Sequence, residues 1–383
     1  MTETIMKSKS RIIFAIALTL LVLTGCKDGN YVNNLPRNAV GLLAVNGGKL
    51  VGAYSPFNVL LTPFVNEDKT QLKGIDLTKD IYFYETADGM FGICAPLADN
   101  YEFHDFVSRL SNIGGVSELK QDGDYSYCFY KNQWAITYNS YCLLVMGPVM
   151  DNQQEREKLV KRMMSQMDND EETSCQGTEL WQHLGESNAP VRFVARASAL
   201  PKQIVSTCTF GAPVGTDPDD VLIEATMTYK DGTLYMDGTT CSSNQHILQA
   251  LKKATGLYKP LTIDWQKAIQ KNALATIFLN VNGKDFINTI NTNKSLSSIL
   301  MSTGAYDQIA QTNGDMVITL APRNNDLLQN GVTATVQKLP KGKKKNKERM
   351  VAVFNTETLL QDITYNIFSS LNKIKRVVFT IDD

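Results

Sequence analysis

The chain has 383 residues, of which 43% are hydrophobic and 20% are charged, and its formal net charge at pH 7 is −1. A chain this close to neutral has no overall attraction to a phosphate backbone, so its composition argues against a nucleic-acid partner. Its apolar fraction is sufficient for buried cores and argues against large-scale disorder. At about 100–200 residues per domain, the length predicts two or three domains.

The N-terminal segment has the organisation of a lipoprotein signal peptide, predicted to span residues 1–25. A basic stretch, Lys7 to Arg11, precedes an apolar run, Ile12 to Leu23, that is too short for a transmembrane helix of about 20 residues. The run ends in Leu23-Thr24-Gly25-Cys26, which resembles the lipobox of bacterial lipoproteins. We therefore expect cleavage before Cys26 and lipid on its thiol. No later segment approaches 18 consecutive apolar residues, so this lipid is the membrane attachment that the sequence predicts.

The residues after Cys26 leave the orientation open. In Bacteroidota, acidic residues just after the lipidated cysteine can direct export to the cell surface, and Lys27-Asp28 weakly resembles such a signal. We expect residues 26–34 to form a tether. The predicted location is the cell envelope, lipid-anchored at the outer membrane, with both the periplasmic and the surface face open.

A repeated order of elements follows the tether. Apolar strands begin after an Asn-Ala step at Asn38, Asn188 and Asn272. In the first two copies a hairpin follows, turning at Asp88-Gly89 or Asp231-Gly232, because Asp-Gly accepts the positive φ of a tight turn. The sequence predicts an α+β fold of antiparallel sheets backed by helices, built from two or three repeated strand–helix–hairpin–helix units.

The predicted elements fall into three units and a connector. The first unit (35–150) has strands at 38–45, 81–85 and 90–97, a helix at 101–112 capped by Asn100, and a meander at 125–130, 133–138 and 141–146. The connector (151–187) has a helix at 152–167 and an acidic loop at 168–172. The second unit (188–260) has strands at 188–195, 221–230 and 233–241 and a helix at 245–255 capped by Asn244. The third, looser unit (261–383) has a strand at 273–281, helical stretches at 284–309, a strand at 316–320, a hairpin of 332–337 with 350–354, a helix at 356–371 and a strand at 375–381.

Six cysteines remain after Cys26, namely Cys94, Cys128, Cys142, Cys175, Cys208 and Cys241. An exported protein can form disulfides, and that alternative stays open. Four of the six nevertheless lie within apolar strand patterns. Cys128 and Cys142 are expected two strands apart, about 9–10 Å, which exceeds the limit of about 7 Å for a bridge. The pattern favours buried free thiols.

The entry into the first strand resembles a known family. Leu35-Pro36-Arg37-Asn38-Ala39, soon after the lipobox, is similar to a proline–x–x–Ala step in an uncharacterised family of Bacteroidota envelope lipoproteins, a domain of unknown function. The resemblance implies an envelope location and this architecture over the mature chain. It implies no activity.

No pattern for catalysis or metal binding stands out. The three histidines, His104, His183 and His246, each lack a second histidine three or four residues away, and no Gly-x-Ser-x-Gly occurs. We interpret the histidines as surface or packing residues. The sequence predicts no catalytic set, no metal and no cofactor.

A basic segment is the first candidate binding surface. It concentrates seven cations, namely Lys338, Lys341, Lys343, Lys344, Lys345, Lys347 and Arg349. Such a segment can contact anionic lipid headgroups or acidic polysaccharide, at about 1 kcal/mol per cation near an anionic surface. The alternative is a solvated hairpin loop kept open by self-repulsion. In either case we expect a mobile loop.

Aromatic residues of the meander are the second candidate, namely Tyr125, Tyr127, Phe129, Trp134 and Tyr138. If exposed, they could stack sugar rings or contact a partner protein; if covered by a helix, they are core. The predicted anchor, together with the lack of a recognisable catalytic set, favours a non-catalytic binding or interaction module whose partners are the membrane, through the lipid, and an envelope protein or glycan. The alternative is an envelope hydrolase with scattered carboxylates, since acid–base pairs need only spatial proximity.

Overall fold

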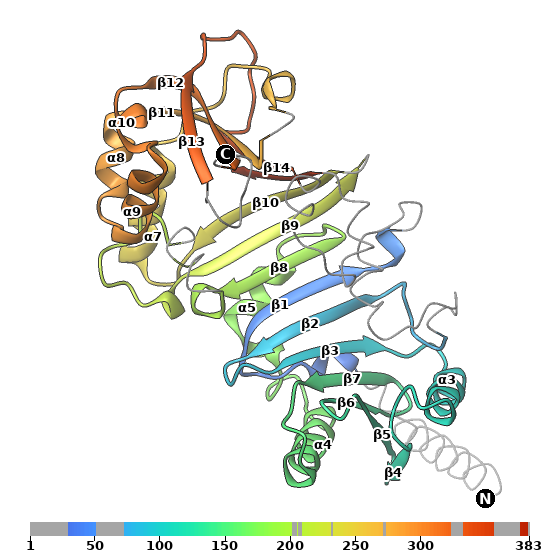
Figure 1. Ribbon diagram of the computed structural model, residues 1–383. Helices are drawn as coiled ribbons and strands as arrows, with labels where there is room; N and C mark the ends of the chain where they lie inside the picture. The colour runs from blue at the N-terminus through green and yellow to red at the C-terminus, as the bar shows by residue number, and fades with distance from the viewer. Residues whose placement is uncertain are drawn as a thin grey trace, which may run out of the picture.

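The computed structural model describes residues 30–50, 73–200, 205, 209–230, 233–270, 273–322, 332–355 and 376–381. Within them, fifteen strands form one continuous sheet accompanied by seven α-helices (Figure 1). Several predictions concern residues outside this part of the chain: the signal segment with Cys26, the turn at Asp231-Gly232, Cys208 and the helix at 356–371.

The strand order is β13-β12-β11-β14-β15-β10-β9-β8-β1-β2-β3-β7-β6-β5-β4. The first seven strands in the chain are β1 (Ala39–Asn46), β2 (Asp80–Thr86), β3 (Phe91–Pro96), β4 (Lys120–Asp122), β5 (Tyr125–Tyr130), β6 (Trp134–Tyr138) and β7 (Cys142–Gly147). The other eight are β8 (Val191–Arg196), β9 (Leu222–Lys230), β10 (Thr233–Cys241), β11 (Ala275–Asn282), β12 (Asn313–Pro322), β13 (Val332–Lys338), β14 (Met350–Asn355) and β15 (Arg376–Ile381). The helices are α3 (Asn100–Asn112), α4 (Gln153–Met167), α5 (Glu179–Gly185), α7 (Gln245–Thr255), α8 (Gly283–Ile290), α9 (Lys294–Thr303) and α10 (Tyr306–Ala310).

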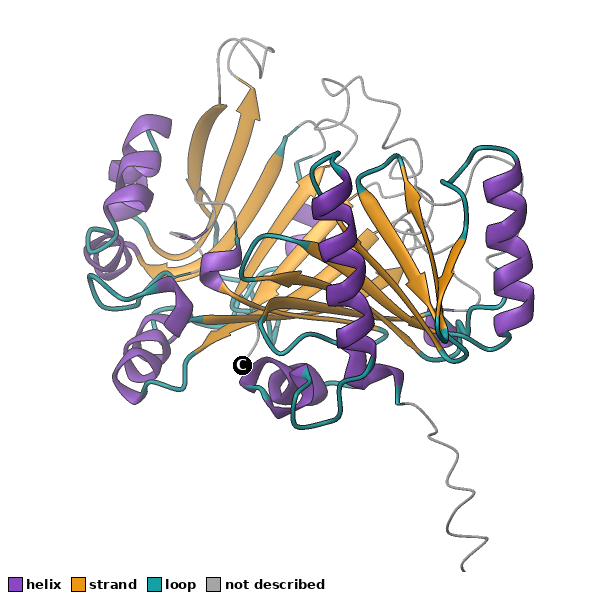
Figure 2. Ribbon diagram, turned by 90° about the horizontal axis from the view of Figure 1, so that it is seen from below, coloured by secondary structure: helices purple, strands orange, loops and turns teal. Residues whose placement is uncertain are grey.

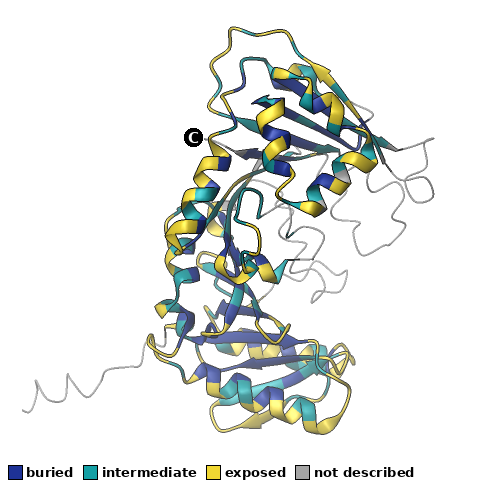
Figure 3. Ribbon diagram, turned by 90° about the vertical axis from the view of Figure 1, so that its left-hand side faces the viewer, coloured by how far each residue is buried: buried dark blue, intermediate teal, exposed yellow. Residues whose placement is uncertain are grey.

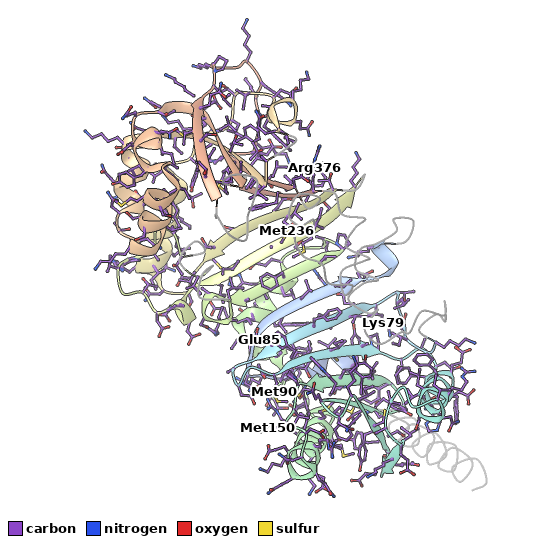
Figure 4. All side chains as sticks on the ribbon, viewed as in Figure 1. Lys79, Glu85, Met90, Met150, Met236 and Arg376 are labelled. Atoms are coloured by element: carbon purple, nitrogen blue, oxygen red, sulfur yellow. The ribbon has the colours of Figure 1, made fainter. Side chains whose placement is uncertain are left out.

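The α+β class is confirmed, but the expected separate sheets are one. β1 pairs antiparallel with β8, so the first two predicted units share a sheet across the connector. β15 joins the third, because it pairs antiparallel with β14 and parallel with β10. Met236 on β10 and Arg376 at the start of β15 mark this parallel pair in Figure 4. Every other neighbouring pair in the order above is antiparallel.

The predicted hairpin of 332–337 with 350–354 is wrong. β13 pairs with β12 at the edge of the sheet, whereas β14 lies between β11 and β15. The basic segment therefore crosses from β13 past β12 and β11. Three strand spacings are about 14 Å, a span that residues 339–349 cover easily. Adjacency in the sequence suggested pairing, but the loop is long enough to allow a different neighbour.

Caps and apolar spacing explain the two long helices of the N-terminal half. Asn152, the first residue of the predicted helix, is the cap of α4, where its side-chain oxygen accepts a hydrogen bond from the Glu155 amide. At α3 the cap is Asp99, one residue before the predicted Asn100, and its carboxylate accepts from two amides. A carboxylate at this position also complements the helix dipole. Gly114, with φ of 75°, follows the end of α3.

The two faces of the sheet are covered by different helices. On β7, Leu144 and Met146 pack into the core beneath α4, while Leu143 and Val145 pack against the side chains of α3. Figure 2 shows helices placed around the sheet, and Figure 3 shows buried strands between helices with exposed outer sides. Alternation along β7 thus separates two cores, as period-two patterning requires.

Helix α5 was not predicted, and it lies over β1, β8 and β9 on the same side as α4. The Thr178 hydroxyl caps it by accepting from the Trp181 amide, and Leu180 and Leu184 are buried beneath it. The opposite side of β9 is covered by α7, whose Ile247 packs with Val221 just before that strand.

The folded body begins earlier than expected. A short 3₁₀ helix, η1 (Tyr31–Asn34), packs against β3, and Asn34 and Leu35 are fully buried. Residues 31–34 of the predicted tether are therefore part of the body. None of the described helices is both long and apolar enough to cross a bilayer.

Candidate functional site

The basic loop is ordered against a neighbouring segment. Its six lysines, Lys338, Lys341, Lys343, Lys344, Lys345 and Lys347, are all exposed, and Arg349 is half-buried. Within the part of the chain that the structure describes, Lys344 is the loop lysine recorded in an ion pair, with Asp264 at 3.3 Å. The lysine charges are therefore directed mainly into solvent.

Backbone hydrogen bonds hold this loop to Thr262. The Gly342 amide donates to Thr262 Oγ1 at 2.9 Å, and the Lys344 amide donates to the Thr262 carbonyl at 3.0 Å. Asn346 Nδ2 donates to the carbonyl oxygens on either side of Thr262, at 2.8 Å each. The approach is close enough that a Cβ at Gly342 would collide with the Thr262 carbonyl oxygen. The expectation of a mobile hairpin loop is therefore corrected: the loop backbone is docked.

The five aromatic residues do not form one face. Tyr125, Tyr127 and Phe129 lie half-buried against the core beneath α4. The Tyr125 hydroxyl donates to Asp168 Oδ1 at 2.6 Å, and the Arg156 guanidinium lies 5.7 Å from the Phe129 ring centre. A helix and its cap therefore cover these three rings.

Trp134 and Tyr138 pack on the other side of the sheet, in the core with α3. The Tyr138 ring is perpendicular to that of Phe103 with centres 5.0 Å apart, and its hydroxyl lies 2.9 Å from His104 Nδ1. The strand register explains the division, since Trp134 is opposite Tyr130 and Tyr138 is opposite Ser126. A helix-covered core is the interpretation that these contacts favour.

A third group, the His183 cluster, consists of His183, Glu224 and Cys241, and the sequence did not predict it. His183 lies in the last turn of α5, Glu224 on β9 and Cys241 at the end of β10. Since Leu222 is opposite Cys241 in the β9–β10 ladder, Glu224 and Cys241 point to the same side of the sheet. That side is the one covered by α5.

Glu224 is the centre of the cluster. Its Oε1 lies 2.9 Å from His183 Nδ1 and accepts a hydrogen bond from Cys241 Sγ at 2.9 Å, whereas Sγ and Nδ1 are 3.9 Å apart. Glu179 and Glu186 lie farther out, their carboxylates 4.0 Å and 3.8 Å from the His183 ring nitrogens Nε2 and Nδ1. Three carboxylates thus surround one imidazole and one thiol.

This geometry is unsuited to a cysteine nucleophile. Such a thiol is activated when an imidazole takes its proton, but here a carboxylate lies between the two. Burial raises the pKa of Cys241, and the hydrogen bond to Glu224 and the charges of Glu179 and Glu186 raise it further. The thiol stays protonated at neutral pH in the absence of a cation.

One signal for the His183 cluster was present in the sequence. Glu179, His183 and Glu186 are spaced at i, i+4 and i+7, which places them on one side of a helix. A pattern that requires two histidines does not include this spacing. Glu224 and Cys241 carried no signal, because their proximity depends on the β9–β10 register and on where α5 docks.

The five described cysteines are free thiols, as predicted. Cys128 and Cys142 are separated by β6, also as predicted. The sequence missed a different proximity: Cys94 on β3 and Cys142 on β7 lie with their Sγ atoms 3.7 Å apart. Since Cys142 is opposite Pro96, the two thiols are diagonal neighbours across adjacent strands.

Comparison with known families decides the membership. Residues 61–369 match the family described as a domain of unknown function, DUF4836. The chain belongs to the DUF4836 family. Membership of a family of unknown function, expected from the residues around Pro36, is thus confirmed.

Other comparisons add little to this DUF4836 chain. No curated protein matches it. Among solved structures, crystal form III of TP0453 is 10% identical with a TM-score of 0.35, covering 56% of this chain and 80% of that one. Crystal form IV of TP0453 is 11% identical with a TM-score of 0.34, covering 54% of this chain and 80% of that one.

Proposed function

We propose that this protein is a lipid-anchored, non-catalytic envelope protein that binds an anionic surface through its basic loop. The observation that carries the proposal is the loop itself: six lysines are exposed on a backbone that is already docked on Thr262. A fixed loop loses less conformational freedom on binding than a mobile one, so more of its electrostatic attraction becomes affinity.

The proposed anchor places the body close to a membrane. Four residues separate Cys26 from Tyr31, where η1 begins. A fully extended chain spans at most about 3.6 Å per residue, so the tether reaches about 18 Å. Lipid on Cys26 would therefore hold the sheet next to the headgroups, at the outer membrane.

The loop lies far from the start of the body. β3, which η1 contacts, is seven strand steps from β14, or roughly 34 Å along the sheet at about 4.8 Å per step. In Figure 1 the loop between β13 and β14 lies at the opposite end of the sheet from β4 to β7. The sheet acts as a spacer between the anchor and the loop. When the sheet lies along the anchoring membrane, the loop contacts that membrane. When the sheet points away from the membrane, the loop can contact an acidic polymer.

The spacer is proposed to be a repeat. β1–β2–β3 followed by α3 and β8–β9–β10 followed by α7 are adjacent in the order β3-β2-β1-β8-β9-β10, with β1 and β8 antiparallel at the centre. This arrangement supports two copies of one unit related by an approximate twofold axis. The third region repeats the strand–helix–two-strand part of this unit, with β11, the helices α8 to α10 and the strands β12 and β13.

Vesicle sedimentation tests the binding function. The six loop lysines would be changed together to glutamine, and the protein mixed with neutral vesicles, anionic phospholipid vesicles or an acidic polysaccharide. At about 1 kcal/mol per lysine, we expect binding to the anionic probe to fall at least about 100-fold. Loss of binding to the anionic vesicles alone identifies lipid headgroups as the ligand. Loss of binding to the polysaccharide alone identifies a glycan as the ligand.

A matched variant controls for total charge. It changes six exposed lysines elsewhere to glutamine, namely Lys120, Lys161, Lys252, Lys253, Lys259 and Lys284. Binding by this variant should change less than about threefold. Equal losses in both variants, or unchanged binding when the loop is neutralised, would overturn the proposal.

Processing tests the anchor separately. Cys26→Ala should leave the signal segment uncleaved by the lipoprotein peptidase, because lipid on this thiol marks the cleavage site. The measurement is the size of the chain and its membrane fraction. Normal cleavage and membrane retention of the variant would show that the chain is held by other means.

A further inference from the structure

We propose that His183, Glu224 and Cys241 bind one divalent transition-metal cation of the Zn²⁺ class. The site is separate from the basic loop and does not depend on the proposed function. It combines an imidazole nitrogen, a carboxylate oxygen and a thiol sulfur, which are the three donor types that zinc uses in proteins. Their donor atoms all lie within 4.8 Å of one another.

The distances suit tetrahedral coordination after small movements. Donors at about 2.0–2.3 Å from a tetrahedral zinc lie roughly 3.3–3.8 Å from each other. Here the distances from Glu224 Oε1 to His183 Nδ1 and Cys241 Sγ are both 2.9 Å, and the third edge, Nδ1 to Sγ, is 3.9 Å. Moving Glu224 outward by a few tenths of an ångström opens the space for the ion.

The charge of the cluster favours a cation. Glu179, Glu186 and Glu224 are all within 4.0 Å of the His183 ring, and His183 and Glu224 are only 24% and 22% exposed. Among the described residues, no lysine or arginine is recorded in an ion pair with these three carboxylates. Like charges that are partly withdrawn from water repel strongly, and a divalent ion removes that repulsion.

The His183 ring is oriented for metal binding through Nδ1. That nitrogen faces Glu224 and Cys241, whereas Nε2 faces Glu179. Metal-bound histidines usually direct their second ring nitrogen to a carboxylate, which fixes the tautomer and raises the basicity of the first. At 4.0 Å from Nε2 the Glu179 carboxylate is beyond hydrogen-bond distance, so it contributes negative charge beside this nitrogen.

The donor set also selects the class of metal. Calcium and magnesium require mostly oxygen ligands, and a thiolate excludes both. The fourth coordination position falls to water or to Glu186, which is 67% exposed and 3.8 Å from Nδ1. Because its three ligands come from α5, β9 and β10, the ion would connect the helix directly to the sheet.

Titration of the full-length chain with zinc ion alone tests the site. The chain, solubilised in neutral detergent and stripped with a chelator, should bind one Zn²⁺ by calorimetry. With Co²⁺ it should give a thiolate-to-metal charge-transfer absorption. Cys241→Ser should abolish that absorption. Cys241→Ser, His183→Gln and Glu224→Gln should each weaken zinc binding more than about 100-fold, since loss of a ligand exceeds the 10- to 100-fold effect of an outer residue.

Matched variants separate a metal site from a loss of structure. His104→Gln and Cys128→Ala alter a histidine and a cysteine outside the cluster and should retain one zinc per chain. Thermal unfolding without metal checks that every variant is folded, and Glu224→Gln is the mildest, because its shape is unchanged. Absence of zinc binding to the original chain would overturn the proposal. So would retention of the charge-transfer absorption in Cys241→Ser, or equal zinc affinity in folded Glu224→Gln.

Discussion

The basic loop and the His183 cluster gather charge in opposite ways. The loop exposes six lysines on a backbone that neutral hydrogen bonds hold to Thr262. The cluster brings three carboxylates around one imidazole, and those of Glu179 and Glu224 are half-buried whereas that of Glu186 is exposed. Water and salt screen the lysines from one another, whereas charges that are partly withdrawn from water are screened less. Like charges in solvent therefore need only a fixed backbone, whereas like charges that are partly buried are stabilised by a counter-ion such as the proposed zinc.

Salt should separate the two regions most strongly. Raising NaCl from about 50 mM to about 500 mM shortens the screening length to a few ångströms and should weaken loop binding to anionic vesicles at least about 100-fold. Zinc affinity at the cluster should change less than about fivefold, because its contacts are direct and partly shielded from solvent. Sedimentation and calorimetry at both salt concentrations measure the two effects. Similar losses at both sites would remove the distinction.

A change of pH should have the reverse effect of salt: it should change zinc affinity at the cluster and leave loop binding unchanged. Zinc must displace the Cys241 proton, and burial together with Glu224, Glu179 and Glu186 holds the pKa of that thiol above its usual range. Zinc affinity should therefore rise about tenfold per pH unit between about pH 6 and 8, because one thiol proton is released for each ion bound. Loop binding displaces no such proton, so it should stay constant over this range. A zinc affinity independent of pH would show that the thiol is not a ligand.

Docking of the loop can be broken at one residue. Gly342→Ala places a Cβ against the Thr262 carbonyl oxygen and should detach the loop. Trypsin cleavage after the loop lysines should then be about tenfold faster, since cleavage follows the population of the open form. Gly185→Ala, where a Cβ would meet nothing within 4 Å, is the control. Equal cleavage of both variants would mean that the contacts with Thr262 do not order the loop.

The smallest effect concerns the metal-free thiol. Glu224→Gln removes the hydrogen-bonded carboxylate that raises the pKa of Cys241, so that pKa should fall and alkylation at about pH 8 should become several-fold faster. The pKa of Cys241 should nevertheless stay above the usual range of a thiol, because burial is the largest cause of its shift. Cys128, whose pKa burial raises to about 12, is the internal reference. Mass spectrometry of the labelled peptides gives both rates, and an unchanged ratio would show that Glu224 does not control the thiol.

Local signals predicted the elements well. Asn244, predicted as a cap, is the cap of α7, and Asp88-Gly89 correctly predicted the turn of the β2–β3 hairpin. These signals depend on contacts within a few residues, so one sequence contains them. Strand pairing between distant segments cannot be predicted from such local signals. For example, β13 and β14 are consecutive in the chain, yet β12 and β11 lie between them in the sheet.

The two sites differ in the same way, because one consists of consecutive residues and the other is assembled from distant elements. The basic loop is a run of consecutive residues, so the sequence predicted its composition, although not its docking on Thr262. The cluster unites three elements, and Cys241 and His183 are 58 residues apart. Only the Glu179 to Glu186 spacing lay within reach of a pattern, and it gains meaning once Leu180 and Leu184 fix how α5 sits on the sheet.

The parallel pairing of β15 with β10 has a consequence for the order of folding. Thr233 of β10 is opposite Arg376 of β15, and among the described strands this ladder joins the β11–β14 side of the sheet to the rest. While the chain folds, β10 and β14 each present an open edge until β15 pairs with both. Open edges recruit other strands, so this is the interval in which a chaperone would be needed. Assembly of the sheet is thus a late event, completed by strand insertion rather than by growth at an end.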